Sequence, residues 1–388
     1  MSTFPRYFDY AATTPVDERV IQHMVTCLGR EGTFGNPASN SHAYGTQARQ
    51  AVELARRQVA ELVGAQAQTL VWTSGATESN NLAIKGIALG HERHNKGARR
   101  HLISSVIEHK AVIDTVRQLE QAGYPVTWLT PDSHGLIQPE AVRQALRDDT
   151  LLVSLMLVNN ELGTLTDIAS IGRLVREHGA IFHVDAAQGT GKVAIDLKNL
   201  DVDLMSFSAH KTYGPKGIGA LYIGERARPL LEAQMHGGGH EQGFRSGTLA
   251  THQIVGMGAA FALASAEMDD EIQRIGTLCA QLLEGLLKLP GITLNGSPQQ
   301  RIPHTLNLCV DSPGFNVMGL SHALAVSSTS ACNSAAGGAS HVLLAIGLSP
   351  EKAATSVRLS LGRYTQIDDI ERAIEAFSEC VASPPTFW

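Results

Sequence analysis

Short apolar runs that alternate with amphipathic helices constrain the fold of this chain more than any other feature of its sequence. Runs typical of buried strands occur at 70–72, 101–104, 151–158, 180–184 and 204–207. Helical segments alternate with them, beginning before the first run with 45–64, whose apolar residues recur at helical spacing until Gly64 favours a stop. This alternation predicts an α/β fold with a large, mostly parallel sheet that helices cover on both faces.

Polar residues follow these strands repeatedly. They are Thr73, His109, Asn160, Asp185 and Lys211. Ligands bind outside the carboxyl ends of the strands in open α/β sheets, so we expect these side chains to share one site. A single such residue is often only a turn or cap residue, as we expect for Asp167 before the helix 168–179. Five polar residues after successive strands instead favour a ligand-binding site.

A second region follows a long helix at about 250–288. Strands are predicted at 292–294, 305–310, 324–326 and 356–361, and a last helix near 366–381. This pattern is typical of a smaller α+β domain, which a chain of 388 residues can accommodate. We expect the large domain to span 15–255, and the small domain to combine 1–14 with 256–388.

Composition excludes several classes of protein. The formal net charge is −6 without a basic block, which argues against nucleic-acid binding. No apolar run is long enough for a membrane span, and the first residues do not resemble a signal peptide. The five cysteines lack CxxC spacing and the sixteen histidines contain no HExxH, so we expect neither disulfides nor a metal site. A reducing cytoplasm is the expected location.

The segment SFSAHKTYGPKGIGALYIG at 206–224 carries the most specific chemistry. A lone lysine after a strand is usually a surface residue, but Lys211 stands in Ser-x-His-Lys before a Gly/Pro-rich turn. The segment resembles the Schiff-base motif of fold-type I pyridoxal-phosphate enzymes, in the class V aminotransferase group. A lysine in a dry, partly cationic pocket has a lowered pKa and reacts readily with an aldehyde.

Two further segments fit a pyridoxal 5'-phosphate site. Asp185, in FHVDAAQGTGK, would face the pyridine nitrogen, because a protonated nitrogen makes the ring an electron sink. TSGATESNN at 73–81 offers a tight turn at Gly75 and a helix N-terminus, which favours an anion such as phosphate. His109 would stack on the cofactor ring and move protons.

Within this group the chain resembles cysteine desulfurases of the NifS/IscS type over almost its whole length. The matching motifs include GNPASNSH, EHKAV, VNNELG, HVDAAQ, SAHKTYGPKG, GGGHEQGFRSGT and SVRLSLGRYT. The resemblance implies that Lys211 forms the Schiff base and that Arg358, helped by Asn160, binds the substrate carboxylate. It implies that Asn160 and Gln188 contact the ring hydroxyl. It assigns the phosphate to Ala76, Thr77, Ser208 and His210, with Thr248 reaching across from a second subunit of a homodimer.

Cys332 is the predicted sulfur acceptor. A lone cysteine is more often a buried small hydrophobe, as expected for Cys309 in a strand and for Cys279 and Cys380 on helices. Cys332 instead lies in a run of Ser, Ala, Gly, Asn and Thr at 327–340, which we expect to be mobile. The family places its persulfide cysteine within SSxSAC, which 327–332 matches.

The resemblance therefore implies that L-cysteine is converted to L-alanine and that Cys332 carries a persulfide to an acceptor protein. Iron–sulfur assembly, tRNA thiolation and DNA sulfur modification all remain open as pathways. The segment 335–339 is smaller than in IscS relatives, and the chain ends at Trp388 before their docking tail, which leaves a more specialised acceptor open. The alternatives are a true aminotransferase, a selenocysteine lyase and a cofactor-binding scaffold without turnover.

Overall fold

A seven-stranded sheet forms the centre of the larger part of the protein. The computed structural model describes residues 4–95, 99–328 and 339–382. The strand order is β2-β8-β7-β6-β5-β3-β4. The strands are β2 (Leu70–Thr73), β3 (His101–Ser105), β4 (Val126–Leu129), β5 (Thr150–Met156), β6 (Ile181–Asp185), β7 (Leu204–Ser208) and β8 (Gly219–Ile223).

The sheet is mostly parallel, which confirms the predicted α/β class. The pairs β3–β4, β3–β5, β5–β6 and β6–β7 are parallel, and only the pairs made by β8 are antiparallel. Every residue of β5 is buried, as expected for a strand covered on both faces. The predicted strands at 70–72, 101–104, 151–158, 180–184 and 204–207 are all present, whereas β4 and β8 were not predicted.

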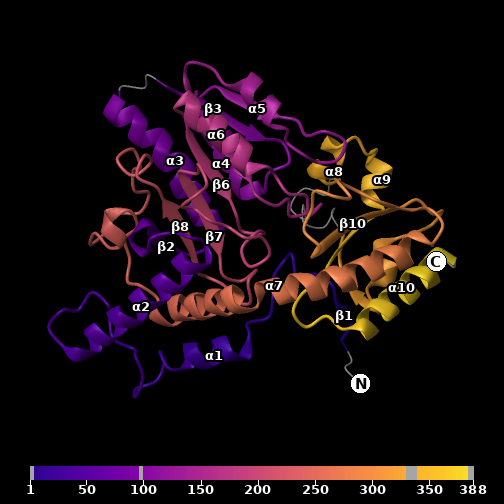
Figure 1. Cartoon of the computed structure of the whole chain (residues 1–388), viewed down its shortest axis with the longest axis horizontal. Coiled ribbons are helices and arrows are strands. Elements are labelled where there is room, and N and C mark those ends of the chain that lie inside the picture. Colours follow the sequence, from indigo (N-terminus) through magenta and orange to yellow (C-terminus); the bar gives the residue numbers. More distant parts are fainter. Residues whose placement is uncertain (1–3, 96–98, 329–338, 383–388) are drawn as a thin grey trace.

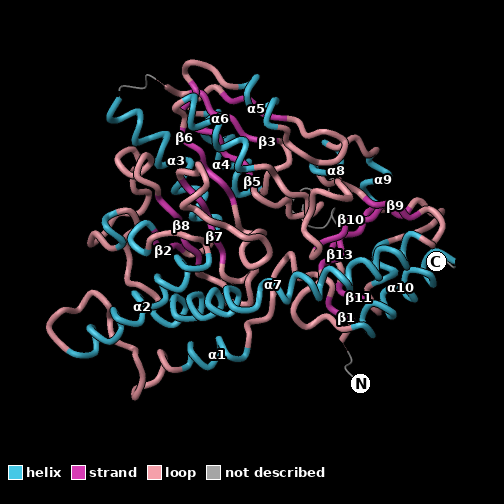
Figure 2. The backbone as a smooth tube through the Cα atoms, in the orientation of Figure 1, coloured by secondary structure: helices cyan, strands magenta, loops and turns pink. Residues whose placement is uncertain are grey.

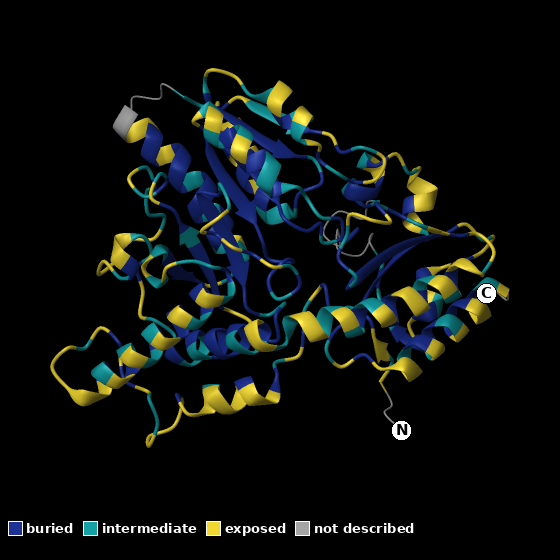
Figure 3. Ribbon diagram, viewed as in Figure 1, coloured by how far each residue is buried: buried dark blue, intermediate teal, exposed yellow. Residues whose placement is uncertain are grey.

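Helices flank this sheet and alternate with most of its strands, as predicted, although the described residues between β6 and β7 form no helix (Figure 1). They are α1 (Glu18–Val25), α2 (Ala43–Leu62), α3 (Ala76–Asn95), α4 (Lys110–Gln121), α5 (Pro139–Ala145) and α6 (Ile168–His178). The predicted cap of α6 is confirmed, because the Asp167 carboxylate accepts a hydrogen bond of 3.0 Å from the Ser170 amide. Gly179 ends α6 at a φ of 85°, which favours glycine. Figure 3 shows the strands buried between helices whose outer faces are exposed.

A smaller antiparallel sheet lies in the C-terminal part of the chain (Figure 2). Its order is β12-β13-β10-β9, and β1 pairs with β11 beside it. These strands are β1 (Arg6–Tyr7), β9 (Ile292–Leu294), β10 (Thr305–Val310), β11 (Leu324–Ala325), β12 (Ser327–Ser328) and β13 (Ser356–Ser360). The accompanying helices are α8 (His341–Ala345), α9 (Pro350–Ala354) and α10 (Ile367–Ala382).

The long helix α7 (Thr251–Leu287) joins the two parts. Ile254 and Phe261 in its first half belong to the apolar core of the large sheet, and Ile275 and Leu286 in its second half belong to the core of the small sheet. The small-sheet core also contains Phe8, so the N-terminal segment packs with the C-terminal part. The domain boundaries themselves stay a prediction, since the expected boundary at 255 falls inside this continuous helix. None of the helices in the described part of the chain is both long and apolar enough to cross a membrane.

Candidate active site

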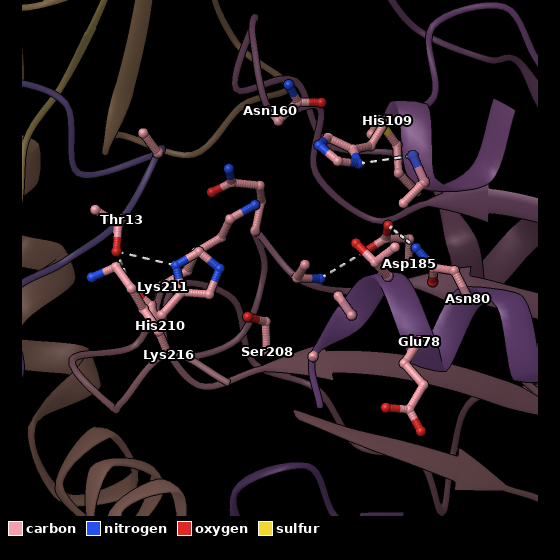
Figure 4. A pocket seen from close by; sticks show the side chains of 18 of the residues that line it. Thr13, Glu78, Asn80, His109, Asn160, Asp185, Ser208, His210, Lys211 and Lys216 are labelled. Atoms are coloured by element: carbon pink, nitrogen blue, oxygen red, sulfur yellow. Dashed lines mark hydrogen bonds between the residues drawn. The ribbon is translucent and has the colours of Figure 1, made fainter. Parts of the chain in front are cut away.

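A cavity of about 510 Å³ opens beyond the carboxyl ends of the large-sheet strands (Figure 4). Asp185 ends β6 and Ser208 ends β7, and both line the cavity. Nine of the predicted site residues meet there, from segments far apart in the sequence. They are Ala76, Thr77, His109, Asn160, Asp185, Gln188, Ser208, His210 and Lys211.

The turn that precedes α3 at the cavity is built on glycine. Gly75 has a φ of +151° and directly precedes Ala76, the first residue of α3, so the amides of the first turn face outward. A Cβ on Gly219 of β8 would lie 2.7 Å from Gly75 Cα and 2.5 Å from the Phe207 carbonyl oxygen. The close approach of β8 to the turn therefore requires glycine at 219 and fixes the position of Gly75.

Glu78 braces the same turn and was missed by sequence reasoning. Its Oε2 accepts a 2.7 Å hydrogen bond from the Ser74 amide, and its Oε1 accepts one of 2.8 Å from Arg245 Nε. Burial raises the pKa of Glu78, but the hydrogen bonds from Arg245 and Ser74 outweigh it and leave the pKa below its usual range. Arg245 thus neutralises a carboxylate that would otherwise repel an anion bound at α3. The sequence did offer a signal for this role, because a glutamate shortly after a Ser-Gly turn at the start of a helix often binds the backbone of that turn.

Asp185 is held by two donors. Its Oδ2 accepts a 2.8 Å bond from Asn80 Nδ2, and its Oδ1 accepts one of 3.0 Å from the Ala187 amide. Asn80 is fully buried on α3 and was also missed, although an amide on the apolar side of a helix was a usable signal. These bonds fix the carboxylate at the cavity wall, as Figure 4 shows.

His109 caps α4 and carries a defined tautomer. Its Nδ1 accepts a 3.1 Å hydrogen bond from the Ala111 amide, so a neutral ring has its proton on Nε2. Burial lowers the pKa of His109, and Lys211 lowers it further, while Asp185 opposes them. A neutral imidazole with a known donor nitrogen therefore stands at the cavity.

The turn that carries Lys211 is fastened to the N-terminal segment. His210 Nδ1 lies 3.1 Å from Thr13 Oγ1, and the His210 carbonyl accepts a 2.9 Å bond from the Thr14 amide. Burial, together with Lys211 and two other lysines, lowers the pKa of His210 to about 4. Tyr213 has a φ of 58°, an uncommon conformation for a tyrosine that is held by its buried surroundings.

Arg358 lies behind Asn160 and does not itself line the cavity. Its Nη2 pairs with Asp9 Oδ1 at 2.7 Å, and its Nη1 donates to the Asn160 carbonyl at 2.8 Å. Only 4% of the side chain is exposed, and Nε finds no acceptor among the described residues. The guanidinium is therefore held in place and still has N–H groups that could bind a ligand.

The buried polar atoms without partners fit the predicted cofactor. Within the described ranges these include Ser208 Oγ and Asn160 Oδ1, which both lie at the cavity. A buried polar group in a folded protein is normally hydrogen-bonded, so such atoms favour a bound polar group. Ser208 suits a phosphate oxygen, Asn160 a ring hydroxyl and the Asp185 carboxylate a pyridinium nitrogen. The set fits pyridoxal 5'-phosphate.

Thr248 and Cys332 complete the set of predicted residues. Thr248 is exposed and does not line this cavity, and Cys332 lies outside the described residues. Cys27, Cys279, Cys309 and Cys380 are buried, and burial raises the pKa of the Cys279 thiol to about 11. The expected burial of Cys309 and the helical positions of Cys279 and Cys380 are confirmed. No group of three or more metal-ligating side chains occurs among the residues that the structure describes.

Known proteins resemble this chain closely in sequence and structure. A family model described as aminotransferase class-V matches residues 6–373. Cysteine desulfurase IscS of Azotobacter vinelandii is 57% identical over 97% of this chain and 93% of its own length. A solved NifS-like protein superposes with a TM-score of 0.87 at 33% identity, covering 98% of this chain and 100% of that one. A structure described as SspA in complex with cysteine has a TM-score of 0.82 at 38% identity, covering 93% of this chain and 100% of the other.

Proposed function

Because the chain belongs to the aminotransferase class-V family and is a pyridoxal-phosphate-dependent cysteine desulfurase, we propose a specific role for each cavity residue. The observation that carries the proposal is that Lys211, Asp185 and the glycine-bounded turn at Ala76 line one cavity. These residues are far apart in the sequence, and a shared cofactor site explains why they meet at one cavity. The alternatives of a true aminotransferase and an inactive scaffold are set aside by the similarity to desulfurases.

Cofactor binding is proposed as follows. The amides of Ala76 and Thr77, with Ser208 and His210, hold the phosphate. Asp185 keeps the pyridine nitrogen protonated, and Asn160 and Gln188 hydrogen-bond to the ring hydroxyl. Lys211 Nζ holds the cofactor covalently. When bound, the cofactor supplies an electron sink that stabilises negative charge at the substrate Cα.

Substrate handling falls to three residues. Arg358 binds the carboxylate of L-cysteine through its remaining donors. The Lys211 amine would remove the Cα proton of the substrate. His109 accepts or donates a proton at Nε2, close to the substrate thiol.

Sulfur transfer is proposed to occur at Cys332. Its thiolate attacks the substrate sulfur, a sulfur–sulfur bond forms and the bond from sulfur to Cβ breaks. The electron pair stays with the carbon fragment, which takes up protons and leaves as L-alanine. The buried positions of the four other cysteines support this choice, because a buried thiol is hard for a substrate to reach. Burial also raises the pKa of the Cys27, Cys279 and Cys380 thiols, which makes them poorer nucleophiles.

Replacing Cys332 tests the assignment directly. Cys332→Ala should keep the cofactor absorbance yet lose alanine formation from L-cysteine. Cys380→Ala, which removes a thiol on the far helix α10, is the matched control and should stay near the parental rate. A Cys332→Ala protein that makes alanine as fast as the parent would exclude the persulfide role.

A homodimer is the second part of the proposal. Large apolar side chains that are about half exposed gather on α1, on α2 and on the loop between them. They are Ile21, Val25, Leu28, Phe34, Tyr44 and Leu54. Such a group is unusual on a monomer and suits a second copy of the chain. Thr248, which is exposed and does not line its own cavity, would then serve the partner's phosphate.

Sedimentation tests the dimer. Val25→Asp with Leu28→Asp should shift the protein towards monomer, whereas Met318→Asp, at an exposed apolar position on the 3-10 turn Val317–Leu320, should not. A persistent dimer in the double variant would place the interface elsewhere.

The sulfur acceptor is proposed to be another protein, in iron–sulfur assembly, tRNA thiolation or DNA sulfur modification. Labelling the enzyme with radioactive sulfur from L-cysteine, and following the label in cell extract, would identify it. We also propose a cytoplasmic location, because the four described cysteines are all unpaired thiols.

A further inference from the structure

A second lysine is buried next to the proposed active site. Lys192 follows β6 on a turn that includes Gly191, and only 9% of it is exposed. Its Nζ donates a 3.3 Å hydrogen bond to Gln188 Oε1. A buried ammonium is costly, so a lysine kept at such a position calls for a role that an apolar residue could not fill.

The surroundings of Lys192 are predominantly cationic. Lys211 and Arg358 both act on it with positive charge, and Glu271 of α7 is the one acid among the groups that perturb it in the described structure. Burial first, and then Lys211, lowers the pKa of Lys192 to about 7. His304, next to β10, is fully buried as well, and neither of its ring nitrogens has a partner within the described ranges. The hydrogen bond of Lys192 in the described structure goes to an amide, and Glu271 acts on it only through its charge, so an ion pair does not explain its burial.

The contact that remains is with the amide of Gln188. Gln188 Nε2 donates a 2.7 Å bond to the Ala11 carbonyl, which can only accept. Lys192 Nζ can donate to Oε1 in either of its protonation states. Both contacts fix the same orientation of an amide whose two ends are otherwise hard to distinguish. One N–H of Nε2 is left over, and Gln188 lines the cavity.

We infer that Lys192 is a positioning residue that orients Gln188, so that the amide N–H and not the carbonyl faces the ring hydroxyl of the cofactor. The inference rests on the proposed function in that Lys211 must carry the cofactor. A hydrogen bond donated to the ring oxygen withdraws electrons from it and weakens its hold on the proton of the neighbouring Schiff-base nitrogen. Lys192 thereby lowers the pH at which the Lys211-bound cofactor gives up that proton.

The test is a pH titration of the cofactor absorbance in four proteins: the parent, Lys192→Met, Gln188→Ala and the double variant. Lys192→Met alone should raise the midpoint by about half to one pH unit, the size of one hydrogen bond. In the Gln188→Ala background the same change should add no shift, because the two residues act through one contact. Lys192→Arg should restore part of the parental midpoint, and Lys198→Met, which removes an exposed charge, should leave it unchanged.

Two results would overturn the inference. Lys192→Met could shift the midpoint equally with and without Gln188, which would show a direct effect of charge, or it could shift nothing. If Lys192→Met does not fold, Lys192→Gln takes its place in the same comparison. Borohydride reduction followed by peptide mapping tests Lys211 separately, since label on another residue refutes the proposed Schiff base whatever the midpoints do. Label on Lys192 itself would refute both.

Discussion

Arg358→Lys is the sharpest test of substrate binding. Arg358 has five N–H donors, of which one serves Asp9 and one serves the Asn160 carbonyl. A lysine keeps the charge but has three donors, so after the same two contacts it has one left for the substrate carboxylate. The variant therefore loses at least one charge-assisted hydrogen bond, worth about 1.5–3 kcal/mol. We expect kcat/KM for L-cysteine to fall about 10- to 100-fold.

The assay compares two substrates. Alanine formation is measured with L-cysteine, and sulfide release with cysteamine, which has the same amine and thiol but lacks the carboxylate. Arg358→Lys should lose much less activity on cysteamine, while cofactor absorbance stays as in the parent. Arg226→Lys is the control, because Arg226 pairs with Asp203 away from the cavity. Equal losses on both substrates, or none on either, would refute carboxylate binding by Arg358.

Three further predictions concern stability and the phosphate turn. Glu241→Ala removes the buried partner of Arg56, leaves it only the more exposed Glu53, and should lower the free energy of unfolding by about 3 kcal/mol in urea denaturation, whereas Glu284→Ala at an exposed pair should leave it unchanged. Burial lowers the pKa of His183 to about 4, so the unfolded chain binds a proton below about pH 6.5 that the folded protein excludes. Stability should thus fall between about pH 6.5 and 4 by up to ~1.4 kcal/mol per pH unit, and His183→Gln should flatten this slope. Gly219→Ala should displace the phosphate turn and weaken cofactor affinity at least about ten-fold by fluorescence titration, and an unchanged affinity would show that the turn adapts.

The central sheet was predictable because its strands are buried on both faces. The run at 151–158 is apolar except at Ser154, and every residue of β5 is buried, a pattern that neither a helix nor a surface strand requires. The strands β4 and β8 escaped for different reasons. Residues of β4 are mostly half-buried at the edge of the sheet, which leaves a weak pattern. β8 follows the Lys211 turn too closely for a crossover, so it must run antiparallel, but its short sequence alone did not mark it as a strand.

The residues that support the site were harder to predict than those that line it. Asp185 is recognisable from its place after a strand, but its partner Asn80 lies on a helix about a hundred positions earlier. Periodicity places each residue on its own element and carries no information about contacts between distant elements. The same holds for Arg245 at Glu78 and for Lys192 at Gln188, which only the folded chain brings together.

The segment 236–248 shows how one motif can combine unlike roles. Glu241 is buried against Arg56, and Arg245 neutralises Glu78, so both fasten the segment to its own subunit. Thr248 is instead exposed and does not line its own cavity. A side chain held outward on a fastened segment is well placed to reach a neighbouring subunit.

Mixed dimers test whether Thr248 acts across the interface. Lys211→Ala should be inactive, and Thr248→Ala should lose cofactor affinity by about ten-fold, the worth of one hydrogen bond to a charged group. If Thr248 serves the partner, a dimer of the two variants has one intact site, with Lys211 from one chain and Thr248 from the other. Its cofactor affinity at that site should equal the parent's. If Thr248 serves its own chain, the mixed dimer has no intact site, and the affinity stays at the Thr248→Ala value.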